Sequence, residues 1–119
     1  MAEAPAHDVD QELLASLQDG VLTLTINRVD ASNAIPYYVR DRLIEHFQRA
    51  HADLAVRCVV LTGAGERHFC TGADLRVRPP APSRPDGAPD FVVGQAVEMM
   101  RTGFQTLMTS IQEIGRAHV

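Results

Sequence analysis

The stretch VRCVVLTGAGERHFCTGADL, residues 56–75, decides the fold of this chain. Its first part, Arg57 to Thr62, is a short continuous apolar run of the kind that a strand buried on both faces of a sheet requires. Gly63-Ala-Gly65 lacks the third glycine of a dinucleotide-binding fingerprint and no helix follows it, so it predicts a turn joining two strands. The end of the stretch, FCTGADL at 69–75, has three competing interpretations: a reactive cysteine, a metal-ligand set, or a turn whose backbone amides are the working groups.

The two side-chain interpretations rest on Cys70 and its neighbours. His68 lies two positions from Cys70, but a catalytic thiol needs a base beside it in space, and this spacing does not guarantee contact. A nucleophilic Cys70 stands beside the simpler interpretation of a small buried side chain packed behind the turn. His68, Cys70 and Asp74 lack a recognisable metal-ligand spacing, so no metal site is predicted.

The backbone interpretation depends on three consecutive residues. Gly72 removes the Cβ that would block a ligand or a strained dihedral, Ala73 is too small to shield its own amide, and Asp74 suits the cap of a helix beginning there. A strand followed by such a turn presents unpaired N–H groups to solvent or to an anion. A plain turn with an aspartate cap uses the same residues, so this signal is weak by itself.

Two strand-like runs lie upstream, at Leu13 to Leu17 and Val21 to Asn27. They flank Asp19-Gly20, and because both residues tolerate positive φ, the pattern predicts an antiparallel hairpin. Apolar and polar residues alternate in the second run, which is the period of a strand with one buried face.

An amphipathic helix is predicted after Pro36, which sits where a first helical residue would. Its apolar face is formed by Val39, Leu43, Phe47 and Ala50. Strand, helix and buried strand in this order predict a right-handed βαβ crossover.

The pattern changes after the FCTGADL stretch. Residues 76–90 contain five prolines, which predicts a mobile surface loop because each proline removes a backbone donor. Helical periodicity then returns and predicts a further helix, with an apolar stripe formed by Val97, Met100, Phe104, Leu107 and Ile111.

The amino-acid composition limits the kinds of protein to which this chain can belong. With 119 residues the chain fits one domain or part of one, and 45% hydrophobic residues, 22% charged residues and a net charge of −4 are those of a soluble globular protein. The missing basic excess argues against a nucleic-acid partner. Residues 1–10 have no apolar run, so they predict a disordered terminus and neither a secretory signal nor a membrane span. Two cysteines match a reducing compartment and a cytoplasmic protein.

The final residues, IGRAHV at 114–119, have two interpretations. They are the translation of ATC GGA AGA GCA CAC GTC, the start of a widely used short-read sequencing adapter. This predicts an adapter-derived tail and a natural protein that continues past residue 113. The alternative is a genuine polar helix end with Gly115 as its cap.

Several motifs in register resemble one known family. DGVLTLTINR at 19–28, SNA at 32–34 and the stretch at 56–75 are similar to the amino-terminal half of the crotonase, or enoyl-CoA hydratase/isomerase, superfamily. The resemblance covers about Leu13 to Leu75. It implies an α/β fold of crotonase-like repeated ββα units, truncated here to a partial domain at 11–113. It also implies an acyl-CoA thioester substrate with no cofactor apart from the coenzyme A of that substrate.

The resemblance also assigns roles to positions in this chain. In the family, two backbone N–H groups hold the thioester oxygen, and the first comes from the residue after the glycine of this turn, which is Ala73 here. Asp74 and Leu75 would support the turn, and main-chain groups near Ala34 would contribute. The implied residues for substrate and coenzyme A binding are Ala34, Thr71, Gly72, Ala73, Asp74 and Leu75.

The leading functional hypothesis is a fragment of an enoyl-CoA hydratase or isomerase acting on a 2-enoyl thioester. The family's second oxyanion donor and its usual acids lie beyond this chain, so no general acid or base is assigned and the fragment alone is expected to be inactive. The alternative is a catalytically silent acyl-CoA-binding or scaffold member of the same fold. A homotrimer or hexamer is implied for the full-length protein, with no membrane or nucleic-acid partner.

Overall fold

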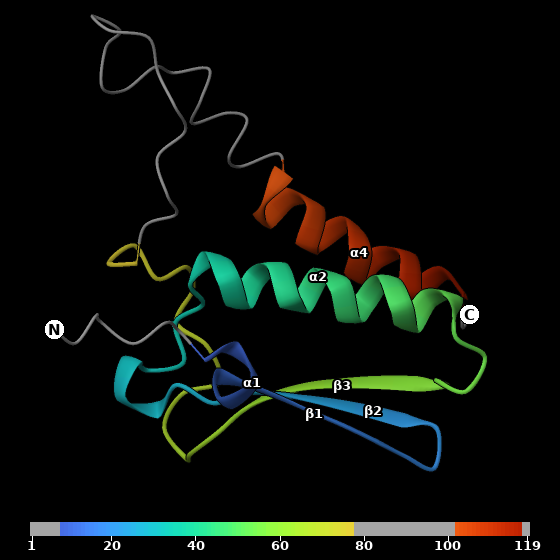
Figure 1. Cartoon of the computed structure of the whole chain (residues 1–119), viewed down its shortest axis with the longest axis horizontal. Coiled ribbons are helices and arrows are strands. Elements are labelled where there is room, and N and C mark those ends of the chain that lie inside the picture. Colours follow the sequence, from blue (N-terminus) through green and yellow to red (C-terminus); the bar gives the residue numbers. More distant parts are fainter. Residues whose placement is uncertain (1–7, 78–101, 118–119) are drawn as a thin grey trace, which may run out of the picture.

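The computed structural model describes residues 8–77 and 102–117 and contains a three-stranded sheet with helices over one face (Figure 1). The strands are β1 (Leu13–Gln18), β2 (Val21–Ile26) and β3 (Cys58–Gly63), in that order across the sheet. β1 and β2 are antiparallel, whereas β2 and β3 are parallel and are connected through the helix α2 (Tyr37–Ala52). The predicted α/β class is therefore confirmed.

The β1–β2 hairpin closes through the predicted two-residue turn. Asp19 and Gly20 have φ values of 54° and 82°, and Gln18 pairs directly with Val21. Positive φ at both central residues gives a turn whose twist matches that of the flanking strands. In β2 the residues that face α2 are buried, namely Leu22, Leu24 and Ile26.

α2 covers the sheet with the apolar face that the sequence predicts. Its buried residues are Val39, Leu43, Ile44, Phe47 and Ala50. Pro36, in contrast, is not the first helical residue: it precedes the helix in an extended conformation with ψ of 165°. The chain is still extended at this point because Ile35, immediately before it, forms a parallel β-bridge with Ala73.

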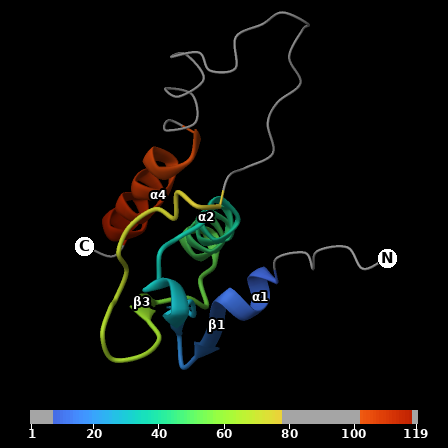
Figure 2. The ribbon, with the colours of Figure 1, turned by 90° about the vertical axis from the view of Figure 1, so that its left-hand side faces the viewer.

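α4 (Phe104–Ala117) packs against α2, and the two helices lie side by side on the same side of the sheet (Figure 2). Leu107 is buried there, and the guanidinium of Arg40 lies 5.4 Å from the centroid of the Phe104 ring. The helix runs through Gly115 to Ala117, so Gly115 is not its cap. The predicted loop at 78–90 and the start of the predicted helix near Val97 lie outside the described residues.

Two further sequence predictions need correction. β3 was expected to be buried on both faces, but among the described residues only the α2 side of the sheet is covered, and Cys58 and Val60 are exposed on the other side. Residues 8–10 were expected to be disordered, yet Asp8 caps the short helix α1 (Val9–Glu12) by accepting a hydrogen bond from the Asp10 N–H at 3.2 Å. In the part of the chain that is described, no helix is long and apolar enough to cross a membrane.

Candidate functional site

Three connecting segments gather at one end of the sheet, opposite the hairpin turn (Figure 1). They are the short 3₁₀ helix η1 (Val29–Ala31) after β2, the approach to α2 at 32–36, and the segment that follows β3. Binding residues are common in loops that a rigid scaffold, such as a sheet covered by helices, holds in position. All the residues predicted to bind substrate lie in these segments.

The segment after β3 is fastened to the approach to α2 by a single β-bridge. Ile35 N–H donates to the Gly72 carbonyl and Asp74 N–H donates to the Ile35 carbonyl, each at 2.8 Å. No second strand forms at His68 to Cys70, so the prediction of a turn joining two strands at Gly63 is wrong on this point. An irregular segment leads from β3 to the one-residue bridge instead.

Within the described part of the chain, the bridge leaves the Ala73 amide without a partner. In an extended segment successive N–H groups point to opposite sides, so the bonds made by Gly72 and Asp74 turn the Ala73 N–H away from Ile35. Among the residues that the structure describes, no acceptor receives this hydrogen. Ala73 is also exposed, which leaves its amide available to a ligand.

Ala73 borders a cleft of about 430 Å³. The cleft is lined by most of the predicted site residues together with η1 and Arg76: Asp30, Ala31, Ser32, Ala34, Thr71, Ala73, Asp74, Leu75 and Arg76. Leu75 is 82% exposed and adds an apolar side chain at this surface. Gly72 is the one predicted site residue that does not line the cleft.

Gly72 has a backbone role that matches its residue type. Its φ of +114° lies in the region that side-chain-bearing residues rarely adopt, and a Cβ would meet no atom within 4 Å. The dihedral, not crowding, therefore requires glycine. Its N–H donates to the Cys70 Sγ at 3.4 Å, so the thiol packs behind the turn and contacts the turn rather than His68. Thr71 steadies the same turn, since its hydroxyl donates to the Ser32 carbonyl at 3.2 Å.

Asp74 is a buried ion-pair partner. Its side chain is 2% exposed and bonds to Arg76 at 3.1 Å and to Arg28 at 2.9 Å. The hydrogen bonds from these two guanidinium groups, Arg76 first, hold the pKa of the Asp74 carboxyl well below its usual range. Asp74 also accepts the Arg76 N–H at 3.0 Å, so in the described residues it caps a turn and not a helix. A carboxylate held in this way is a poor proton acceptor for catalysis.

Sequence reasoning missed two residues that organise the site, Asn33 and Arg28. Asn33 is 1% exposed, has a φ of 57°, and donates through Nδ2 to the carbonyls of Ala64 and His68 at 2.9 and 2.8 Å. Asparagine tolerates this left-handed conformation, so the SNA motif carried a usable signal. For Arg28 the usable sequence signal was a charged residue close to the end of an apolar strand.

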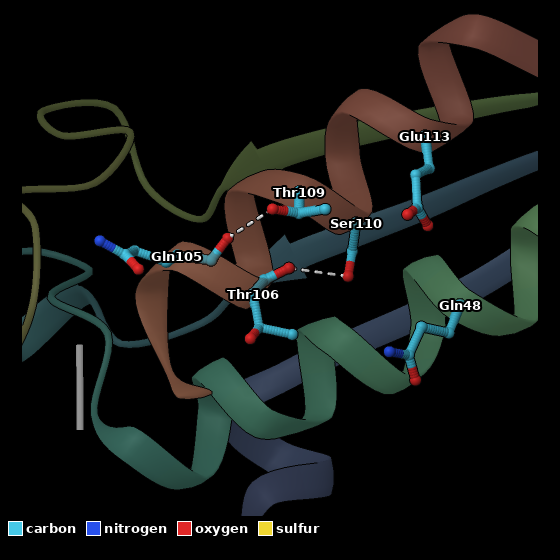
Figure 3. A pocket seen from close by; sticks show the side chains of 6 residues that line it. All are labelled: Gln48, Gln105, Thr106, Thr109, Ser110 and Glu113. Atoms are coloured by element: carbon cyan, nitrogen blue, oxygen red, sulfur yellow. Dashed lines mark hydrogen bonds between the residues drawn. The ribbon is translucent and has the colours of Figure 1, made fainter. Parts of the chain in front are cut away.

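A second hollow lies between α2 and α4 and has only polar side chains around it (Figure 3). It is lined by Gln48, Gln105, Thr106, Thr109, Ser110 and Glu113. The hydroxyls of Thr109 and Ser110 donate back to carbonyls of their own helix, at 3.0 and 2.8 Å. None of the predicted site residues lines this hollow.

Comparison with known proteins identifies the family. The family model described as Enoyl-CoA hydratase/isomerase matches residues 16–105, and the chain belongs to that family. It is 40% identical over 86 residues to a 1,2-epoxyphenylacetyl-CoA isomerase from Escherichia coli (strain K12), covering 72% of this chain and 31% of that protein. It is 42% identical over 60 residues to an (E)-benzylidenesuccinyl-CoA hydratase from Thauera aromatica, covering 50% of this chain and 23% of that protein.

Solved structures agree with the family at the level of the fold. A carnitinyl-CoA hydratase from Mycobacterium avium matches with a TM-score of 0.53 and 38% identity, over 56% of this chain and 25% of that chain. An enoyl-CoA hydratase from Mycobacterium tuberculosis H37Rv matches with a TM-score of 0.51 and 38% identity, over 55% and 29%. This chain thus spans less than a third of the length of each of these four relatives.

Among the described residues, no group of three or more histidine, cysteine, aspartate or glutamate side chains is arranged to hold a metal ion. The cleft offers main-chain groups, hydroxyls, apolar side chains, the ion-paired Asp74 carboxylate, and the charged side chains of Asp30 and Arg76. A set of this kind suits the binding of a polar carbonyl group by hydrogen bonds.

Proposed function

We propose that the protein carrying this chain is an enzyme that hydrates or isomerises a 2-enoyl-CoA thioester, and that the Ala73 N–H is a donor to the thioester oxygen. The observation that carries the proposal is that Ala73 lines the cleft and that its N–H has no acceptor among the described residues. The named activities of the two curated relatives, an isomerase and a hydratase of CoA compounds, support the same substrate class.

The chemistry needs a donor at this place because negative charge moves onto the thioester oxygen. Addition of water to the double bond, or removal of a proton beside the carbonyl, gives that oxygen enolate character in the transition state. A fixed N–H stabilises this charge more than it stabilises the neutral carbonyl, and one such donor contributes about 10²–10³ in rate. Asp74, held ionised by two arginines, takes no part in proton transfer in this proposal.

We assign the remaining site residues to binding. Thr71 and Gly72 border the path of coenzyme A, the main chain near Ala34 contributes a contact, and the exposed Leu75 offers an apolar surface beside the cleft. No cofactor apart from the coenzyme A of the substrate is proposed, because hydration and double-bond isomerisation transfer no electrons to or from the substrate.

The wider setting is part of the same proposal. Two unpaired cysteines support a reducing, cytoplasmic compartment, and the net charge of −4 argues against a nucleic-acid partner. The superfamily that the sequence resembles assembles as trimers or dimers of trimers, which supports a homotrimer or hexamer for the whole protein.

Substitution of Ala73 in the complete protein tests the proposal. Ala73→Pro removes the amide hydrogen, while the two backbone bonds of the bridge come from Ile35 and Asp74 and need no hydrogen at Ala73. We expect turnover of crotonyl-CoA, followed by loss of its absorbance, to fall by about 100-fold or more. Ala73→Gly, which keeps the N–H, is the matched control and should retain most of the turnover. Equal turnover in Ala73→Pro and the unaltered enzyme would show that this amide is not the oxyanion donor.

A further inference from the structure

We propose that Arg28 is a positioning residue for the Ala73 amide, an inference that rests on the proposed function. Arg28 follows the end of β2, and its side chain is 12% exposed. Its Nη1 donates to the Ala34 carbonyl and to Asp74 Oδ2, the latter at 2.9 Å. One nitrogen thus joins the residue before Ile35 to the residue after Ala73, on the two segments of the bridge.

The bridge is short, so the position of the turn depends on side-chain contacts such as that of Arg28. It consists of a single residue pair with two backbone hydrogen bonds, and Thr71, Ala73 and Leu75 are all exposed. Apolar packing therefore contributes little to the position of the Ala73 amide. An oxyanion donor must be held to within about 0.5 Å of its working position. Thr71 and Asn33 also join the two segments through hydrogen bonds to main-chain carbonyls, but Arg28 acts on the residues next to the bridge, Ala34 and Asp74, and adds an ionic contact.

The position of the Arg28 side chain is fixed by further hydrogen bonds. Its Nε donates to Glu12 Oε1 at 2.8 Å, and the Tyr38 hydroxyl donates to the same oxygen at 2.8 Å. Burial and the hydrogen bond to Glu12 raise the pKa of Tyr38 to about 12, so this phenol keeps its proton at every ordinary pH. The Arg28 backbone N–H also donates to Asn33 Oδ1 at 2.9 Å. Contacts from α1, α2 and the SNA motif therefore set the position of the guanidinium.

The arrangement requires arginine and not merely a positive charge. The guanidinium fork bonds Glu12, the Ala34 carbonyl and Asp74 at the same time, with its donors in a fixed plane. A lysine ammonium is a compact charge on a flexible stem, and it would reach Asp74 without holding the other two acceptors. Arg28→Lys therefore separates the geometric role from the charge.

The test compares kcat and KM for crotonyl-CoA in the complete protein. We expect Arg28→Gln to lower kcat about 10- to 100-fold while KM changes by less than about threefold, because a displaced donor loses transition-state stabilisation first. Arg28→Lys should fall between Arg28→Gln and the unaltered protein. Arg42→Gln is the matched control, since it removes an arginine that pairs with Asp10 at the surface, and its kcat should stay within about twofold.

Ala73→Pro is measured beside these variants so that the two proposals fail separately. Loss of turnover in Ala73→Pro with an unchanged kcat in Arg28→Lys would overturn the role of Arg28 and leave the proposed function standing. Normal turnover in Ala73→Pro would overturn both. If Arg28→Gln does not fold, Arg28→Lys decides: a lower melting temperature with an unchanged kcat would mean that Arg28 has a structural role only.

Discussion

The two ends of β2 are closed in different ways. At its start, the Asp19-Gly20 turn leads straight back from β1, and the Gly20 carbonyl accepts the N–H groups of Arg57 and Cys58 at 2.7 and 3.2 Å. These contacts are made by the backbone. At its other end, buried polar side chains of Arg28, Asn33 and Asp74 tie together segments far apart in sequence. The first end is held by backbone hydrogen bonds, whereas the second depends on hydrogen bonds of polar side chains and carries the candidate site.

The same contrast appears in the cost of a change at each end. A backbone turn tolerates variation because solvent replaces whatever contact is lost. A buried polar network does not, since a donor or acceptor left without its partner costs about 1–3 kcal/mol. In the described residues every fully buried side-chain nitrogen and oxygen has a partner, so the network at the site end is complete.

Gly63→Ala is expected to give the largest effect on stability. A Cβ at this position would lie 2.2 Å from the Phe69 carbonyl oxygen and 2.8 Å from Asn33 Nδ2, and a backbone atom cannot move aside cheaply. We expect a loss of about 3 kcal/mol or more in the free energy of unfolding. Urea denaturation measures it. A loss below about 1 kcal/mol would mean that the site end adapts as easily as the hairpin end.

Asp74→Asn should have a smaller effect that depends on pH. The folded-state pKa of Asp74 lies below its ordinary value of 3.8, so the stability that its charge contributes is present above that pH and is lost as the pH falls toward the folded-state pKa. At pH 7 we expect the variant to be about 2–3 kcal/mol less stable, since Arg28 is left without its buried partner.

Unfolding free energies of Asp74→Asn and the unaltered chain at pH 7, pH 5 and pH 3 check this expectation. The difference should be equal at pH 7 and 5 and smaller at pH 3. Asp41→Asn, which breaks a surface pair with Arg40, is the control and should cost little at any pH. A difference for Asp74→Asn that stays constant down to pH 3 would argue that the carboxylate charge does not stabilise the site.

Gly20→Ala at the hairpin end should have the smallest effect. The φ of +82° disfavours alanine, but the closest atom to the new Cβ, at 2.9 Å, is the flexible Arg57 Cδ, which moves aside. We expect a loss of about 1 kcal/mol, and less for Gly20→Asn because asparagine tolerates this conformation better. Denaturation of both variants beside Gly63→Ala tests the ranking, and a larger loss at Gly20 than at Gly63 would reverse the comparison.

Sequence reasoning succeeded where the pattern is local. The hairpin followed from Asp19-Gly20 between two strand-like runs, and α2 followed from an apolar stripe that the structure buries. It failed where the outcome depended on distant partners. The extended Pro36 follows from the bridge between Ile35 and Ala73, and the exposed face of β3 follows from which elements cover the sheet. Neither the conformation of Pro36 nor the exposure of β3 can be predicted from the neighbouring residues in the sequence.

For the candidate site, the sequence indicated the residue types and the structure supplied their arrangement. Five of the six predicted binding residues line the cleft, and Gly72 adopts the dihedral that its lack of a side chain permits. The roles of Arg28 and Asn33 were missed because each depends on acceptors in segments distant from it in the chain. The binding and catalytic roles assigned to the six predicted residues remain predictions, and the Ala73 and Arg28 variants test them.

By itself the sequence determined the strands, the hairpin turn and the helix over the sheet, because side-chain periodicity and the φ range of glycine act over a few neighbouring residues. Only the tertiary structure decided that the Ala73 amide has no acceptor among the described residues. The bonds that turn it outward are made by Ile35 and Asp74, and the ionic contact that supports them comes from Arg28. These residues meet only when the chain is folded, since hydrogen bonds act over about 3 Å whatever the distance along the sequence.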